Sequence, residues 1–118
     1  MEIKKNPYLG LRGSRVLVGI VDTGIDYLNN EFIREDGRTR ILSIWDQSIQ
    51  GASSKDVFIG RVFSEEDINN AINLLKSGGD PYSIVPTKDE VGHGTKVASI
   101  IGARGYDEEV EGIAPDCE

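Results

Sequence analysis

The sequence predicts an α/β fold, and three observations support that prediction. Residues 15–21, R-V-L-V-G-I-V, are apolar at nearly every position and rich in β-branched side chains, as in a strand covered on both faces. A capped helix is expected after Ser64, and a second helix is expected from about His93. The order strand, helix, strands, helix, helix is typical of layered α/β proteins. We therefore expect a mainly parallel central sheet with helices packed on it.

Residues 15–21 are the best candidate for the central parallel strand. In residues 25–32, apolar side chains recur at helical spacing, which indicates a turn or short helix packed back on the sheet. Gly37 is the expected positive-φ residue of the turn that follows. The β-rich runs 40–46 and 57–63 are separated by a loop containing Gly and Ser, and their spacing predicts a hairpin-like pair.

The clearest helix begins after Ser64, whose hydroxyl is expected to accept a hydrogen bond from the N–H of Asp67. Acidic residues follow Ser64, where they favour the positive end of the helix dipole, and Lys76 with Gly78 marks the end. Four apolar side chains form one stripe that we interpret as core packing: Ile68, Ala71, Ile72 and Leu75.

The second helix has an apolar pattern from Val97 to Ile101. Val97, Ile100 and Ile101 are expected to supply its apolar face. Ala98 is expected at a close-packing position, before glycines loosen the chain.

Composition limits the possible functions. At 118 residues the chain is one domain at most, and its net charge of −7 comes without a basic stripe, which argues against a nucleic-acid partner. Cys117 is the only cysteine, so neither an internal disulfide nor a zinc site of thiolates is available. The N-terminus has no apolar signal-peptide region, and no segment approaches the roughly 20 apolar residues that span a bilayer, so no membrane partner is expected.

Asp22 ends the first predicted strand, in V-G-I-V-D-T-G-I-D at residues 18–26. Asp and Gly are ordinary turn residues, so a structural turn is one interpretation. Aspartic proteases use the letters D-T-G and pair them with a later apolar-apolar-Gly, which I-I-G at 100–102 resembles. Subtilisin-like serine proteases use the same letters for an aspartate that orients a histidine. The capped helix predicted after Ser64 disfavours an all-β aspartic protease.

His93, the only histidine, separates these interpretations. A lone histidine is most often a surface residue or a satisfied core residue. This one lies between Gly92 and Gly94, directly before a helical pattern, and two glycines leave its ring unobstructed. That is the setting of a residue presented to a bound chain.

Three motifs resemble those of the subtilisin-like serine peptidases, in the order of that family. V-G-I-V-D-T-G-I-D resembles the aspartate motif, G-H-G-T-K-V-A-S-I-I-G-A the histidine motif, and E-G-I-A-P the segment that leads into the next central strand. The resemblance implies that residues 1–118 are the N-terminal portion of a three-layer catalytic domain, truncated before the nucleophile half, with an insert at about residues 34–90. The insert is most similar to clostridial subtilisin-like proteins, including the Csp germination proteases of spores.

The resemblance implies that Asp22 and His93 are two members of an Asp-His-Ser triad that hydrolyses peptide bonds of a protein or peptide substrate without a cofactor. Gly24 and Gly94 would give room around the pair. None of the nine serines stands in the family's Gly-Thr-Ser motif, so we expect this chain alone to be inactive. A regulatory pseudoprotease of the same fold is the alternative, and a dimeric aspartic protease is the third hypothesis.

The loop G-Y-D-E-E-V-E, residues 105–111, falls where some relatives bind calcium, but it does not clearly reproduce their ligands. A solvated acidic loop is the simpler interpretation, and the metal stays unassigned. Cutting a doubly wound sheet exposes apolar edges, so either self-association or a partly rearranged fold of the chain is expected. The resemblance is compatible with a secreted, envelope or spore location of a bacterial parent protein, and it does not choose among them.

Overall fold

The computed structural model describes residues 10–50, 59–106 and 111–118, and these form two compact units. The first unit combines the chain up to Arg40 with the chain from Lys88 onward, and the second consists of residues 41–87. The second unit lies within the interval of about 34–90 where the resemblance implies an insert. Of the helices in the described ranges, none is long and apolar enough to cross a membrane.

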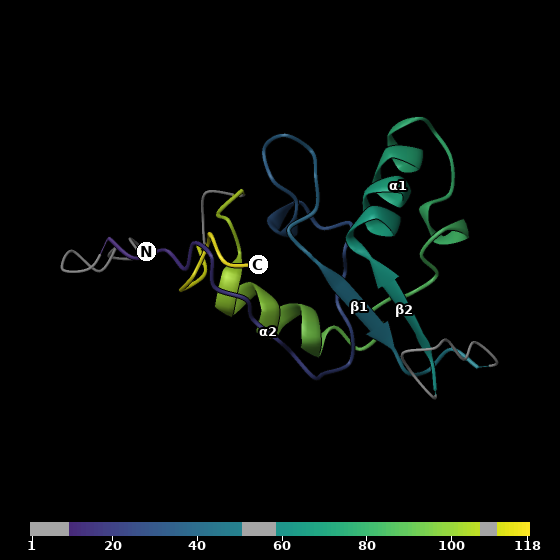
Figure 1. Cartoon of the computed structure of the whole chain (residues 1–118), viewed down its shortest axis with the longest axis horizontal. Helices are drawn as coiled ribbons and strands as arrows, with labels where there is room; N and C mark the ends of the chain where they lie inside the picture. The colour runs from purple at the N-terminus through teal and green to yellow at the C-terminus, as the bar shows by residue number, and fades with distance from the viewer. Residues whose placement is uncertain (1–9, 51–58, 107–110) are drawn as a thin grey trace. The chain divides into compact units, whose positions relative to one another are not determined.

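The second unit is a two-stranded antiparallel sheet followed by a helix. Strands β1 (Ser43–Asp46) and β2 (Arg61–Ser64) pair in the register Ser43 with Ser64 and Asp46 with Arg61. Helix α1 (Glu65–Lys76) continues directly from β2 (Figure 1). The predicted hairpin is confirmed, although both strands begin later than the runs 40–46 and 57–63. Positions 57 and 58 of the second run lie outside the described residues.

Helix α1 begins as its sequence predicts. The Asp67 N–H donates to Ser64 Oγ over 3.1 Å, and the Ser64 N–H donates to the Asp67 carboxylate over 2.9 Å, a reciprocal capping box. Ile68, Ala71 and Ile72 are buried, as predicted.

The prediction that Leu75 packs in the core is wrong, since Leu75 is 47% exposed. The turn that ends α1 folds back over the neighbouring leucine instead. A Cβ atom on Gly79 would lie 2.4 Å from Leu74 Cδ1. Leu74 is thus the residue that the turn covers, and Leu75 faces solvent.

In the first unit, the predicted strand 15–21 has no ladder partner within the described segments. Its backbone exchanges hydrogen bonds with Glu118: the Val18 N–H donates to Glu118 O over 2.7 Å, and the Glu118 N–H donates to Val16 O over 2.9 Å. That exchange is the pattern of parallel strands. The mainly parallel sheet is therefore absent from the described structure, whose sheet is antiparallel, because a strand needs a run of such bonds.

The segment after Asp22 forms a short 3-10 helix, η1 (Asn30–Phe32), where the sequence predicts a turn or short helix. The Asn29 side chain accepts a hydrogen bond from the N–H of Glu31 and caps it. Gly37 has a φ of 86°, in the predicted turn, and Ile33 and Thr39 form an isolated antiparallel bridge across that turn.

Helix α2 (His93–Gly102) starts at the predicted residue but buries a different face. Its buried residues are small ones at four-residue spacing, Gly94, Ala98 and Gly102, whereas Ile100 is 67% exposed. The reason is close packing, since a Cβ on Gly102 would lie 2.9 Å from Cys117 Sγ. The prediction of Ile100 in the apolar face is therefore wrong, and that of Ala98 as a close-packing residue is confirmed.

Arg40 is a buried charged residue that ties three parts of the first unit together. Only 7% of it is exposed, and its guanidinium donates to the carbonyl oxygens of Glu31 and Cys117 over 3.1 and 2.8 Å and to that of Gly102. Desolvation by burial lowers the pKa of Arg40. The C-terminal end of α2 is thus anchored by a cation, whose charge suits the negative end of the helix dipole.

Candidate functional site

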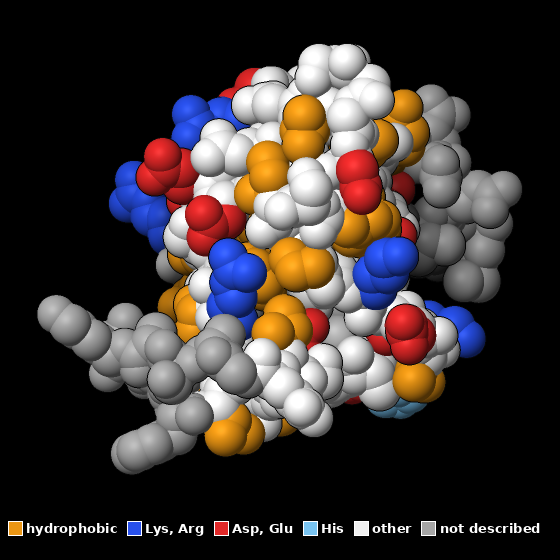
Figure 2. All heavy atoms as spheres, turned by 90° about the vertical axis from the view of Figure 1, so that its right-hand side faces the viewer, with side chains coloured by type: hydrophobic (Ala, Val, Ile, Leu, Met, Phe, Trp, Pro, Cys, Tyr) orange, Lys and Arg blue, Asp and Glu red, His pale blue; other side chains and the backbone are white. Residues whose placement is uncertain are grey.

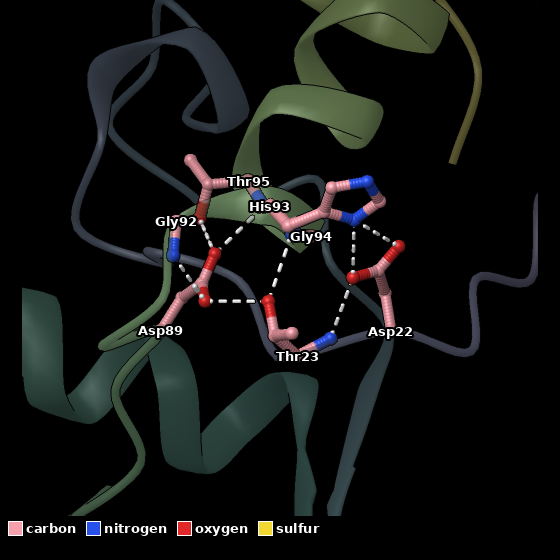
Figure 3. A network of polar contacts seen from close by, with 7 residues as sticks. All are labelled: Asp22, Thr23, Asp89, Gly92, His93, Gly94 and Thr95. Atoms are coloured by element: carbon pink, nitrogen blue, oxygen red, sulfur yellow. Dashed lines mark hydrogen bonds and ion pairs between the residues drawn. The ribbon is translucent and has the colours of Figure 1, made fainter.

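The structure brings Asp22 and His93 together, although 70 residues separate them in the sequence. Nδ1 of His93 lies 2.8 Å from Oδ1 and 2.9 Å from Oδ2 of Asp22 (Figure 3). Asp22 follows the extended segment, and His93 is the first residue of α2. These two residues, singled out from the sequence, are therefore hydrogen-bond partners within the first unit.

The hydrogen bond fixes the role of each ring nitrogen. A carboxylate only accepts, so Nδ1 carries the proton and donates, which leaves the lone pair of a neutral ring on Nε2. The side chain of Asp22 is 15% exposed, while that of His93 is 67% exposed. The ring is thus held on one edge and open to solvent on the rest.

Asp22 is held as an anion. The hydrogen bond from His93, followed by that from the Thr23 N–H at 2.7 Å, lowers the pKa of the Asp22 carboxyl below its ordinary value. The arrangement can therefore accept a proton at Nε2 and stabilise the resulting positive charge on the ring.

Gly24 and Gly94 bring the two motifs into backbone contact, where the sequence predicted that they leave room. A Cβ on Gly94 would lie 2.1 Å from the carbonyl oxygen of Gly24. Gly24 itself has a φ of 129°, which side chains rarely adopt. The two glycines therefore serve close packing of α2 on the Asp22 segment, as Figure 1 shows for the course of the chain beside α2.

Asp89 is a polar residue of this site that the sequence argument missed. Its carboxylate accepts hydrogen bonds from Thr23, Gly92 and Thr95 (Figure 3). A signal was available, because the N-cap residue of α2, Gly92, has no side chain to cap with. Asp89, four residues before His93, is the next residue upstream of a type that commonly caps helices.

The other predicted features are not gathered at this site. Ile100 to Gly102 form the last turn of α2, so this segment is not the extended one that an aspartic protease pairs with D-T-G. Among the described residues, no group of three or more His, Cys, Asp or Glu side chains could hold a metal ion. Most of the acidic loop considered for calcium, positions 107–110, lies outside the described residues.

The chain resembles known proteins both in sequence and in fold. The profile of the Subtilase family, peptidase family S8, matches residues 13–118. Among solved structures, the chain is similar to the CspB protease of Clostridium perfringens, with 39% sequence identity and a TM-score of 0.73. That match covers 95% of this chain but only 21% of the protease. No curated protein matches the chain significantly. On the match of the family profile over residues 13–118, the chain belongs to the subtilase family.

Proposed function

We propose that this chain supplies the aspartate and the histidine of a subtilisin-like serine endopeptidase site that hydrolyses peptide bonds in protein substrates. The observation that carries the proposal is the 2.8 Å contact between His93 Nδ1 and Asp22 Oδ1, on an otherwise exposed ring. In this role Nε2 of His93 takes the proton of a serine hydroxyl and later returns it to the leaving amine. Asp22 holds the ring in the required tautomer and stabilises the imidazolium.

The serine is proposed to come from a part of the peptidase beyond these 118 residues, since none of the nine serines stands in the nucleophile motif. The chain spans about a fifth of the length of the CspB protease, so the complete activity belongs to a longer protein in this proposal. The chain by itself is then inactive, the reaction needs no cofactor, and a protein or peptide is the partner.

A chimera tests the proposal directly. Residues 13–118 replace the aligned segment of the CspB protease, and labelling by a serine-directed fluorophosphonate is measured together with cleavage of a protein substrate. We expect labelling of the chimera, its loss on His93→Ala and Asp22→Ala, and none for the 118-residue chain alone. A folded chimera that resists labelling would favour the pseudoprotease alternative. Inhibition by an aspartyl-directed compound instead would favour the aspartic-protease hypothesis.

A further inference from the structure

We propose that Asp89 is the positioning residue of the Asp22–His93 pair, because its single carboxylate joins the segment that carries Asp22 to the start of the helix that carries His93. The consequence of this positioning for catalysis rests on the proposed function, but the hydrogen bonds of Asp89 do not depend on it. Figure 3 shows Asp89 beside the pair, with Thr23 between the two carboxylates. Asp89 contacts neither ring nitrogen, so it acts through its neighbours.

On the helix side, Asp89 closes the N-terminus of α2. Oδ2 accepts from the Thr95 N–H over 2.8 Å and from Thr95 Oγ1 over 2.6 Å, and Oδ1 accepts from the Gly92 N–H over 2.9 Å. The first N–H groups of a helix have no partner inside it, and a carboxylate there is also favoured by the helix dipole. Asp89 therefore binds Gly92, directly before His93, and Thr95, two residues after it.

On the other side, Asp89 is linked to Asp22 through Thr23. The Thr23 hydroxyl donates to Asp89 Oδ1 over 2.8 Å and accepts from the Gly94 N–H over 2.9 Å. The Thr23 N–H in turn donates to Asp22 Oδ1 over 2.7 Å. The positions of the two members of the pair are thus coupled by a continuous chain of hydrogen bonds from Asp89 to Asp22.

A second hydroxyl closes the network. Thr95 Oγ1 donates to Asp89 and accepts from the N–H of Asp26, over 2.9 Å. Each threonine hydroxyl has one proton, and in both cases the hydroxyl donates it in a hydrogen bond to Asp89. The hydroxyl oxygen in turn accepts a hydrogen bond from a backbone N–H. The two segments are thereby locked in one register by two equivalent bridges.

The hydrogen bonds at position 89 require a carboxylate and cannot all be made by an amide. Both oxygens of Asp89 accept two hydrogen bonds each, Oδ1 from Thr23 and Gly92 and Oδ2 twice from Thr95. An asparagine has one accepting oxygen, so in either orientation its NH₂ group would face two donors. Asp89→Asn, which keeps the shape of the side chain, should therefore break one half of the network.

The sole histidine makes the consequence measurable in the 118-residue chain. With ¹⁵N-labelled histidine, the ring nitrogens report how completely the neutral ring adopts the Nδ1–H tautomer that donates to Asp22. We expect Asp89→Asn, measured at a temperature where circular dichroism shows it folded, to lower the Nδ1–H to Nε2–H ratio at least about twofold. Addition of Asp22→Asn should remove any further effect of the Asp89 change.

Asp80→Asn is the matched control, because Asp80 caps η2 (Pro81–Ser83) through the Tyr82 N–H, away from His93 in the sequence and in the other unit. It should leave the histidine signals unchanged. If Asp89→Asn does not fold, Thr23→Val and Thr23→Ser carry the test: the valine removes the hydroxyl at constant shape, and the serine restores it. We expect the tautomer ratio to fall with valine and to recover with serine.

Wild-type histidine signals in a folded Asp89→Asn chain, or in a folded Thr23→Val chain, would overturn the inference. A chimera without peptidase activity would count against the proposed function alone, since the ring signals do not require cleavage. Wild-type ring signals in Asp89→Asn would count against the positioning role alone.

Discussion

Gly24 and Gly94 touch through their backbones, and a Cβ on Gly94 would come 2.1 Å from the Gly24 carbonyl oxygen. Gly24 is the second residue after Asp22, and Gly94 directly follows His93, so this contact sets how closely α2 approaches the Asp22 segment. A methyl group cannot be accommodated there unless the helix moves.

Gly94→Ala should therefore destabilise the chain, although alanine is the better helix former. Overpacking of this kind costs about 1–3 kcal/mol, and urea unfolding measures it. Gly19→Ala is the matched control, because no atom lies within 4 Å of a Cβ at Gly19, and we expect a change within about 0.5 kcal/mol. Equal effects of the two substitutions would contradict the packing role of Gly94.

Asp22→Asn should disturb the tautomer of His93 without unfolding the chain. The asparagine amide can either donate to Nδ1 or accept from it, so it does not favour the tautomer with the proton on Nδ1. The ¹⁵N spectra should therefore report a mixture of the two neutral forms of the ring. Asp26→Asn changes a nearby carboxylate that accepts from the Leu28 N–H, and it should leave the ring as it is. A single Nδ1–H form in Asp22→Asn would show that another group orients the ring.

Arg40→Met should cost roughly 2–4 kcal/mol of unfolding free energy, because buried carbonyl oxygens of three segments lose a charged donor. Arg34 provides the comparison. It pairs with Glu118 over 3.1 Å at the surface, with both side chains about 40% exposed, so Arg34→Met should cost under about 1 kcal/mol. A similar loss in both variants, measured by urea unfolding, would argue against the anchoring role of Arg40.

The stabilisation by Asp89 should depend on pH. Partial desolvation would raise its pKa, but the hydrogen bonds from Thr95, Thr23 and Gly92 outweigh it and hold the pKa of Asp89 well below the ordinary 3.8. A carboxyl with a lowered pKa stabilises the fold fully above its unfolded pKa, and this is lost as the pH falls through the folded pKa. The gap in Tm between wild type and Asp89→Asn should thus be widest near about pH 6 and narrow below 3.8. A gap that stays constant down to about pH 2 would contradict this.

Self-association is expected from the apolar side chains that the first unit leaves in solvent. Leu17 is 71% exposed, Val21 96% and Ile113 81%. Such surfaces tend to be buried between molecules, so light scattering should give a mass that rises with concentration. Leu17→Lys and Ile113→Lys should lower that mass, while Ser14→Lys, at an exposed polar position, should not. On the face in Figure 2, hydrophobic side chains are interspersed with charged ones.

Local chemistry made much of the secondary structure predictable. The Ser64 capping box, the start of α2 at His93 and the hairpin follow from caps, turns and periodicity within a few residues. The pairing of Asp22 with His93 was also predictable, but only through resemblance to a family, since no local rule brings together residues so far apart in the sequence.

The sequence by itself determined which residues are proposed to carry the chemistry, because Asp22 and the glycine-flanked His93 are recognisable by their motifs. Only the tertiary structure decided what holds them. Asp89 and Arg40 act through hydrogen bonds to segments distant in the chain, and the small face of α2 is buried because neighbouring backbone leaves no space for larger side chains. Periodicity ranks residues by hydrophobicity, whereas burial here is decided by steric fit and by the pairing of polar groups, which depend on the partner segment.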